Sequence, residues 1–337
     1  MAKLSIVEAL REAIREEMRR DERVFCIGED IDIEGGFGGA FTVTLGLSKE
    51  FGHGRVIDTP ISEIALCGMA IGAAVAGMRP IADVQYGDFL FCMMDQLANE
   101  AAKLRYMSGG QVSVPMVMRA PVGSTRRGSQ HAQNLEGFFT HVPGLKVVAP
   151  STAYDAKGLL KSAVRDGNPV LFFEHKLLYG SKGQRSEVGA LSPVGEVPDE
   201  EYLVPIGKGI IRREGKDLTI VATHRMLYES LAAADKLVLK GIEVEVIDPR
   251  TLVPLDKDLI FDSVRKTGRL MIVEEDNLTN GWGAEIAALA ADEVFEWLDA
   301  PIKRLASPDV PPPFAPVLEK EYLQNEAKII SAVESLL

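Results

Sequence analysis

The chain has 337 residues, of which 46% are hydrophobic and 26% charged, and its formal net charge is -12. This length exceeds what one ordinary hydrophobic core supports, so we expect two domains. The excess of Asp and Glu repels phosphate backbones and anionic lipids, which argues against nucleic acids and membrane surfaces as partners.

Cysteine usage and hydropathy predict a cytoplasmic protein. Cys26, Cys67 and Cys92 stand in apolar surroundings at uneven spacing, so we expect small core residues in a reducing compartment. The longest uncharged stretch, residues 64–78, is shorter than the ~20 residues that a membrane span needs. Residues 1–17 mix acids with bases and predict an amphipathic helix rather than a targeting signal.

Short apolar runs typical of buried strands alternate with segments of helical periodicity in the first half of the chain. The predicted strands are residues 24–27, 56–58, 81–84, 114–119, 144–150 and 169–174, and the predicted helices are residues 6–18, 60–78, 89–107 and 152–168. This alternation predicts an α/β fold, a mostly parallel sheet with helices on both faces.

The periodicity fails from Ser181 to Ile206, where Gly, Pro, Ser and acidic residues dominate, and then restarts. Predicted strands at residues 218–223, 243–248 and 269–275 alternate with predicted helices at residues 225–241 and 256–268. Two successive crossovers predict a second, smaller parallel domain. We therefore expect one domain over residues 1–185, a linker over 186–205 and a second domain over 206–337.

Glu63 heads a run of small apolar residues with no further charge before Arg79. One interpretation is local: Thr59 caps a helix that begins at Pro60, and an acid in the first turn gains about 0.3–1 kcal/mol from the helix dipole. The glycines that follow instead favour close approach of another backbone, which would bury the carboxylate. A buried carboxylate needs a specific partner, such as a cofactor nitrogen.

Several segments carry a family resemblance, in this order along the chain: DTPISE, GMAIGAAVAGMRPIADVQYGDF, DQLANEAAKLRYMSGG, GSQHAQNLEGFFTHVPGLKVVAP, FFEHKLLYG, IDPRTLVPLD and VEE. Together they resemble the β subunit of the thiamin-diphosphate-dependent first component (E1) of 2-oxoacid dehydrogenase complexes. The resemblance implies a transketolase-like pyrimidine-binding domain followed by a transketolase C-terminal-like domain.

The resemblance also implies roles around Glu63. This carboxylate would hydrogen-bond the pyrimidine ring of thiamin diphosphate and relay a proton when the cofactor is activated. Ile61 and Phe89 would line the pyrimidine pocket, with ordinary core packing as the alternative. Glu29 would extend an acidic proton path, or would simply be a solvated strand end.

His131 lies in a polar loop that follows a predicted strand, where α/β folds often carry catalytic groups. The resemblance implies an active-site histidine that stabilises charge and assists acyl transfer to a lipoyl arm; a surface histidine is the alternative. His141 is expected to be structural at a helix end. Arg126 and Arg127 stand where relatives carry small residues, and they could face a substrate carboxylate, a lipoyl domain or solvent.

Two further segments bear on ligands. The glycine-rich loop at residues 33–41 lacks the GxGxxG order, so we expect flexible lining rather than a phosphate cradle. By resemblance, Asp166 and Asn168 could hold a structural monovalent cation such as K⁺, although the same residues are typical of an ordinary turn.

The chain contains no Gly-Asp-Gly motif of the kind that binds the Mg²⁺ of thiamin diphosphate. We therefore expect a separate α subunit that supplies the diphosphate and Mg²⁺ site, in an α2β2 tetramer with sites at the α/β interface. The helix predicted at residues 89–107 is a candidate contact, with core packing as the alternative. The second domain is expected to dock a lipoyl-bearing dihydrolipoyl acyltransferase core.

These inferences predict an oxidoreductase subunit that acts in oxidative decarboxylation of a 2-oxoacid with acyl transfer to a lipoyl domain. Pyruvate, branched-chain 2-oxoacids and acetoin remain open as substrates. The alternatives are a β subunit of an acetoin dehydrogenase, a split transketolase-type subunit, and a scaffolding chain that has kept the fold without catalysis.

Overall fold

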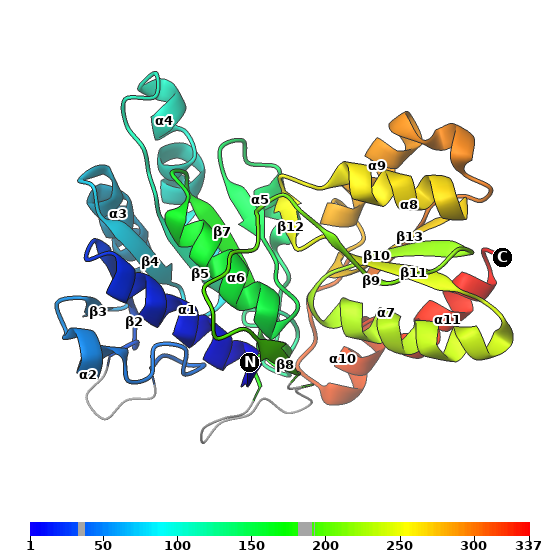
Figure 1. Ribbon diagram of the computed structural model, residues 1–337, viewed down its shortest axis with the longest axis horizontal. Coiled ribbons are helices and arrows are strands. Elements are labelled where there is room, and N and C mark those ends of the chain that lie inside the picture. Colours follow the sequence, from blue (N-terminus) through cyan, green and yellow to red (C-terminus); the bar gives the residue numbers. More distant parts are fainter. Residues whose placement is uncertain (33–37, 181–190, 192) are drawn as a thin grey trace.

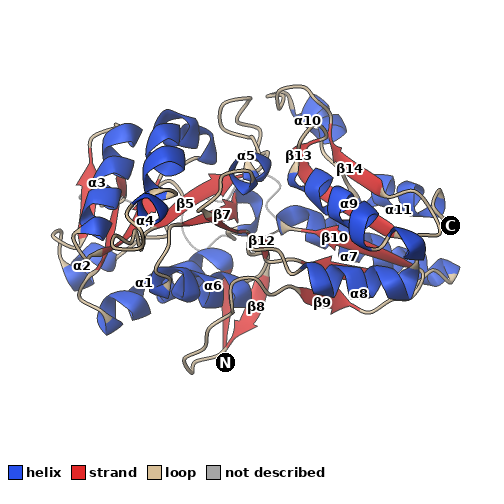
Figure 2. Ribbon diagram, turned by 90° about the horizontal axis from the view of Figure 1, so that it is seen from above, coloured by secondary structure: helices blue, strands red, loops and turns tan. Residues whose placement is uncertain are grey.

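Two α/β bodies lie side by side in the computed structural model, which describes residues 1–32, 38–180, 191 and 193–337 (Figure 1). Each body is built on its own mostly parallel sheet, and helices form the outer layer around the strands (Figure 2). This arrangement confirms the predicted fold class. Most of the glycine-rich loop lies outside the described residues.

The sheet of the first body has seven strands. All pair in parallel except the edge strand β12, which runs antiparallel to β6 and comes from the second half of the chain. It therefore ties the two bodies together. In spatial order the strands are β12 (Thr251–Val253), β6 (Lys146–Val148), β7 (Val170–His175), β5 (Val117–Val122), β4 (Arg79–Asp83), β2 (Val24–Glu29) and β3 (Val56–Thr59).

Alternate residues of the first sheet enter two different cores, as the period of a strand requires. Val24 and Cys26 of β2 pack in the cluster formed with α1 and α6, whereas Phe25 and Ile27 pack in the cluster formed with α3 and η1. The helices of the first body are α1 (Ile6–Arg20), α2 (Leu47–Phe51), α3 (Glu63–Val75), η1 (Gly87–Met93), η2 (Gln96–Ala101), α4 (Leu104–Met107), α5 (Glu136–Thr140), α6 (Ala153–Arg165) and η3 (Lys176–Leu178).

The sheet of the second body has five strands, of which only the edge strand β9 is antiparallel to its neighbour. α7 and α11 pack on one face, and α8 and α9 cover the other with a core that is continuous with the first body. The elements are β14 (Lys303–Ser307), β13 (Leu270–Asn277), β10 (Leu218–Ala222), β11 (Val244–Asp248), β9 (Ile210–Arg213), α7 (His224–Leu237), η4 (Val238–Lys240), α8 (Lys257–Thr267), α9 (Trp282–Glu293), η5 (Phe295–Trp297), α10 (Pro316–Tyr322) and α11 (Glu326–Glu334).

Three local predictions are wrong. The helix after Pro60 begins only at Glu63, with Ser62 as its N-cap residue and Thr59 as the last residue of β3. The segment at 89–107 is a 3-10 helix, a π-helix and a short α-helix rather than one continuous helix. Cys92 is exposed rather than in a core.

The predicted linker contains a strand. Strand β8 (Val194–Val197) lies inside that segment and pairs antiparallel with β1 (Ala2–Ser5), which precedes the first helix. The domain borders at 185 and 205 stay predictions. None of the helices formed by the described residues combines the length and apolarity that a bilayer crossing requires.

A buried ion cluster joins three neighbouring strands beneath the carboxyl edge of the first sheet. Arg119 on β5 is 1% exposed and donates to Asp83 on β4 (2.5 Å) and to Glu174 on β7 (2.6 and 2.8 Å). Tyr179 also donates to Glu174. Because these charges are removed from water, each depends on the others for its stability.

Replacing Arg119 with Leu is expected to lower the free energy of unfolding by about 3–5 kcal/mol, because Asp83 and Glu174 would remain buried without a cation. Urea denaturation measures this loss. Arg265→Leu is the control, since Arg265 pairs with Asp262 at the surface (2.8 Å), and this change should alter the midpoint little. Equal midpoints for the two variants would contradict the interpretation.

Candidate active site

Four of the predicted site residues, Glu29, Glu63, Phe89 and His131, lie at or after the carboxyl ends of strands in the first sheet. β2 ends at Glu29, β3 leads into Glu63, β4 leads into Phe89, and β5 leads into the loop that carries His131. These strands are parallel to one another, so their carboxyl ends open at the same edge. Ligand sites of open α/β sheets lie at this position.

Glu63 is the first residue of α3 and is partly exposed. Among the described residues its carboxylate has no hydrogen bond or ion pair. Glu29 lies nearby, 4% exposed, and accepts a hydrogen bond from the Ser62 N–H at 3.1 Å. Burial raises the pKa of Glu29, and the charge of Glu63 raises it further. Glu29 is therefore a buried acid that supports the start of α3, and the solvated alternative is wrong.

Two aromatic rings surround His131. The imidazole lies edge-on to Phe89 at 5.4 Å and to Tyr86 at 4.8 Å between ring centroids. Lys176, the first residue of η3, donates to the His131 carbonyl oxygen at 2.7 Å. Phe89 is half-buried, whereas Ile61, just before α3, is 77% exposed. The structure thus brings Phe89 and His131 together and leaves Ile61 on an open surface.

Buried oxygen atoms without a hydrogen-bond partner occur around this edge. Buried polar atoms in native proteins are nearly always paired with protein, water or ligand. A cluster of unpaired ones, together with the unpaired Glu63 carboxylate, therefore fits a polar cofactor or a partner subunit that completes the edge. Among the described residues these atoms are Thr59 Oγ1, Asp88 Oδ2, Thr125 Oγ1 and Asn134 Oδ1.

A neutral histidine and an ionised glutamate meet behind the His131 loop. His175 Nδ1 accepts the Leu177 N–H (3.2 Å), so Nε2 carries the proton and donates to Glu275 (2.8 Å). Burial lowers the pKa of His175. Burial opposes the charge of Glu275, but His175, Arg225 and the Ser124 N–H outweigh it and lower the pKa of Glu275 to about 2.

Sequence reasoning gave no role to His175 or His224, and both are buried between the two bodies. His224 Nδ1 lies 3.3 Å from a Glu136 oxygen. The signal that could have found His175 and Lys176 is their place at the carboxyl end of a strand. His141 is exposed at the C-terminal end of α5, as expected of a helix-end residue.

Basic side chains of the protein already bind the turn at Asp166 and Asn168, the candidate site for a monovalent cation. Asp166 pairs with Lys146 and accepts two hydrogen bonds from Asn168, both at 2.9 Å. Arg79 donates to the carbonyl oxygens of Val164 (2.8 Å) and Asp166 (3.0 Å). These contacts fit an ordinary turn better than a K⁺ site, which stays a prediction. Elsewhere in the described chain no three His, Cys, Asp or Glu residues are grouped to hold a metal ion.

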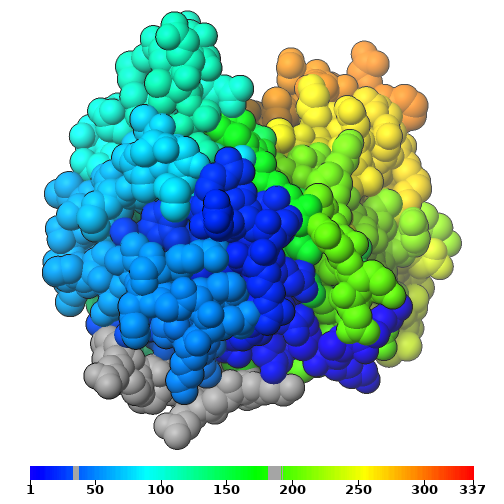
Figure 3. Space-filling view, turned by 60° about the vertical axis from the view of Figure 1, so that its left-hand side comes forward, coloured from blue at the N-terminus to red at the C-terminus, as the bar shows by residue number. Residues whose placement is uncertain are grey.

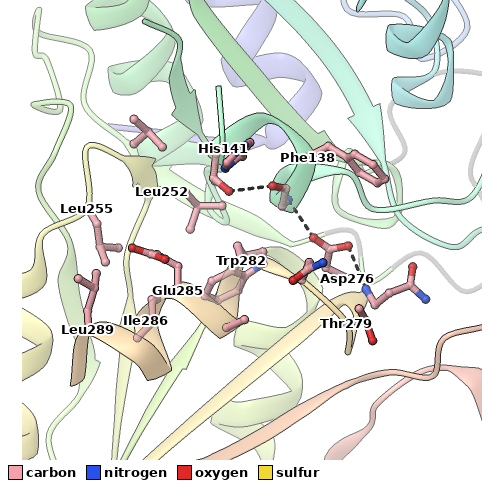
Figure 4. A pocket seen from close by; sticks show the side chains of 17 residues that line it. Phe138, His141, Leu252, Leu255, Asp276, Thr279, Trp282, Glu285, Ile286 and Leu289 are labelled. Atoms are coloured by element: carbon pink, nitrogen blue, oxygen red, sulfur yellow. Dashed lines mark hydrogen bonds between the residues drawn. The ribbon is translucent and has the colours of Figure 1, made fainter. Parts of the chain in front are cut away.

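A pocket of about 880 Å³ lies between the two bodies, between α5 and β12 on one side and α9 on the other (Figure 4). Trp282 contributes to its apolar wall, and Asp276 lines it while accepting the Gly137 N–H at 2.9 Å. Burial and the nearby Glu136 raise the pKa of Asp276 well above its usual range. Among the described residues that line this pocket, none is a predicted site residue, so the carboxyl edge remains the candidate site.

Comparisons with known proteins agree with this architecture. Residues 2–182 match the family described as "Transketolase, pyrimidine binding domain", and residues 207–329 match "Transketolase, C-terminal domain". A solved structure titled "Split gene transketolase, inactive beta4 tetramer" superposes with a TM-score of 0.78 at 22% identity, covering 100% of this chain and 99% of that one. At this identity the likeness supports the fold alone.

Curated relatives match the full length of this chain. The β subunit of acetoin:2,6-dichlorophenolindophenol oxidoreductase of Bacillus subtilis is 46% identical, covering 99% of this chain and 97% of the relative. The β subunit of 2-oxoisovalerate dehydrogenase of the same organism is 45% identical, covering 100% and 99%. The pyruvate dehydrogenase E1 component subunit β of Rhizobium meliloti is 45% identical, covering 100% and 70%. The chain therefore belongs to the family of E1 β subunits of 2-oxoacid dehydrogenase complexes.

Proposed function

We propose that this chain forms one half of a thiamin-diphosphate site and completes it with an α subunit, in an enzyme that decarboxylates a 2-oxoacid and transfers the acyl group to a lipoyl domain. The observation that carries the proposal is the Glu63 carboxylate, which heads a helix at the carboxyl edge without a partner among the described residues. A carboxylate in this place suits a ring nitrogen that must exchange a proton.

Each residue at the edge has a distinct task in this proposal. Glu63 holds a proton against the pyrimidine ring, while Phe89 and Ile61 provide apolar contact to it. His131 donates a hydrogen bond to charge that develops on the substrate side. Thiamin diphosphate, when bound, supplies the electron sink for decarboxylation. The α subunit contributes the Mg²⁺ and diphosphate contacts.

The outward face of α3 supports an α partner that packs closely. Ile64 is 58% exposed and Met69 is 48% exposed, and a Cβ added at Gly68 or Gly72 would meet nothing within 4 Å. Gly68 and Gly72 therefore serve no packing within the described part of the chain. They would allow the backbone of another helix to approach closely, which explains their presence better than helix propensity does.

A second exposed region supports further contact with partner chains. α4 stands out at one end of the first body in Figure 1, and the cyan segment around it projects at the top of Figure 3. Tyr106 and Met107 on this segment are 90% and 61% exposed. In the second body, Phe295 (70%) and Trp297 (54%) lie among exposed acids and would suit a basic module of the acyltransferase core.

The substrate remains a choice among three. The relatives' names cover pyruvate, 2-oxoisovalerate and acetoin, and acetoin is a candidate because a relative with 46% identity carries that name. Arg126 and Arg127 are exposed near His131, where a guanidinium could face the substrate carboxylate.

Glu63→Gln tests the catalytic proposal. The amide keeps the size of the side chain but cannot take up a proton, so turnover by the reconstituted α2β2 enzyme should fall by about 10²- to 10⁴-fold. Gel filtration should show normal assembly. Asp258→Asn, at another first-turn acid, on α8, is the control and should keep full turnover. Undiminished turnover of Glu63→Gln would instead favour a scaffolding chain.

Gly68→Leu tests the partner surface. The free chain should fold normally and gain up to about 1 kcal/mol from helix propensity, because the added side chain meets open space. Mixing with the α subunit should then yield little tetramer by analytical ultracentrifugation. Ala288→Leu on the exposed side of α9 is the matched control. Normal tetramer formation by Gly68→Leu would place the α contact elsewhere.

A further inference from the structure

The loop that carries His131, residues 123–133, is held by the second body as well as by the first. We call it the histidine loop. The two ends of the loop are held within the first body. The Gly123 N–H donates to the Gln133 carbonyl (3.2 Å), and the Gln133 side chain donates to Asp88 (2.8 Å). Its opposite arm, residues 124–129, contacts the second body instead.

Four contacts join this arm to the second body. The Ser124 N–H donates to Glu275 at 2.9 Å, and the Arg126 N–H donates to Glu319 at 2.6 Å. The Ser129 hydroxyl donates to the Pro312 carbonyl at 2.8 Å. Gly128 packs against the Phe314 ring, so closely that a Cβ added at Gly128 would lie 3.3 Å from it. Two carboxylates of the second body thus accept backbone N–H groups two residues apart in the loop.

We propose that Glu275 and Glu319 are positioning residues, a carboxylate clamp through which the second body sets the shape of the histidine loop and the direction of the His131 ring. The proposal rests on the proposed function of His131. Neither carboxylate is placed against the reacting atoms; each acts through the backbone that it holds.

The backbone of the loop needs such support. Arg126 has a φ of +60°, a left-handed conformation that a residue with a Cβ rarely adopts. Gly123 and Gly128 in the same loop also have positive φ angles. Strained conformations persist where the surroundings over-determine them. A hydrogen bond from a backbone N–H to a carboxylate is stronger than one to a neutral acceptor, so Glu319 is well suited to hold Arg126.

The other half of the clamp is itself fixed on both sides. One oxygen of Glu275 accepts the Ser124 N–H and the other accepts from the neutral His175. His175 packs directly on the start of the loop, because a Cβ at Gly123 would lie 2.2 Å from its Nε2 atom. Glu275 therefore cannot move without moving the base of the histidine loop.

Glu275→Gln and Glu319→Gln test the clamp in the reconstituted α2β2 enzyme. Each change keeps the size of the side chain and removes its charge. We expect kcat for acyl transfer to fall by about 10- to 100-fold, as expected for a misplaced catalytic group, with the KM for thiamin diphosphate unchanged. Amide hydrogen exchange within residues 123–131 should become faster.

Glu274→Gln is the matched control. Glu274 precedes Glu275 on β13 and is fully buried. Within the described ranges its donors all belong to the second body, Gly283 (2.8 Å) and Arg304 (2.5 Å). Its replacement should leave kcat and exchange in the loop unchanged even where it lowers stability. Because Glu319 lies on α10 and Glu275 on the central strand β13, Glu319→Gln remains informative if Glu275→Gln fails to fold.

His131→Ala separates this inference from the proposed function. If His131→Ala keeps full turnover, the catalytic role of His131 fails, and faster exchange in the clamp variants would still show that the second body shapes the loop. The clamp itself is overturned if both variants keep wild-type kcat and exchange, or if Glu274→Gln produces the same changes as they do.

Discussion

The parallel pairing of β2, β3, β4 and β5 is the constraint on which the rest of the site depends. It delivers the carboxyl ends of all four strands to one edge, so residues far apart in sequence meet there without further design. The buried Arg119 cluster locks β4, β5 and β7 beneath that edge. The Gln85 N–H extends this network from Asp83 (3.0 Å), and the Gln85 side chain reaches the Glu29 carbonyl.

The chain by itself presents an incomplete site. Glu63 has no partner among the described residues, Ile61 is exposed, and buried oxygens around the edge lack hydrogen bonds there. In a finished protein each of these features is unfavourable. All three features are explained if a cofactor and a second subunit cover this surface, which is the arrangement proposed for this E1 β subunit.

Much of the fold could be predicted from sequence, because period-2 and period-3.6 patterns are local signals. The role of Glu63 came from the family resemblance and stays a proposal. The predicted start of α3 was wrong because Thr followed by Pro is typical of a helix N-terminus, whereas Thr59 ends β3 and α3 begins at Glu63. The broken helix at 89–107 and the exposure of Cys92 could not be predicted, since both follow from packing. Glu275 lies 151 residues from Ser124, and no local pattern reports such a contact.

The most direct test of the half-site is calorimetric titration of thiamin diphosphate with Mg²⁺ into this chain alone, into the α subunit alone and into their mixture. The account predicts saturable binding by the mixture and none by this chain alone at the same concentrations. The reason is that this sequence lacks a Gly-Asp-Gly motif, and the account assigns the Mg²⁺ and diphosphate contacts to the α subunit. Tight binding by this chain alone would contradict it.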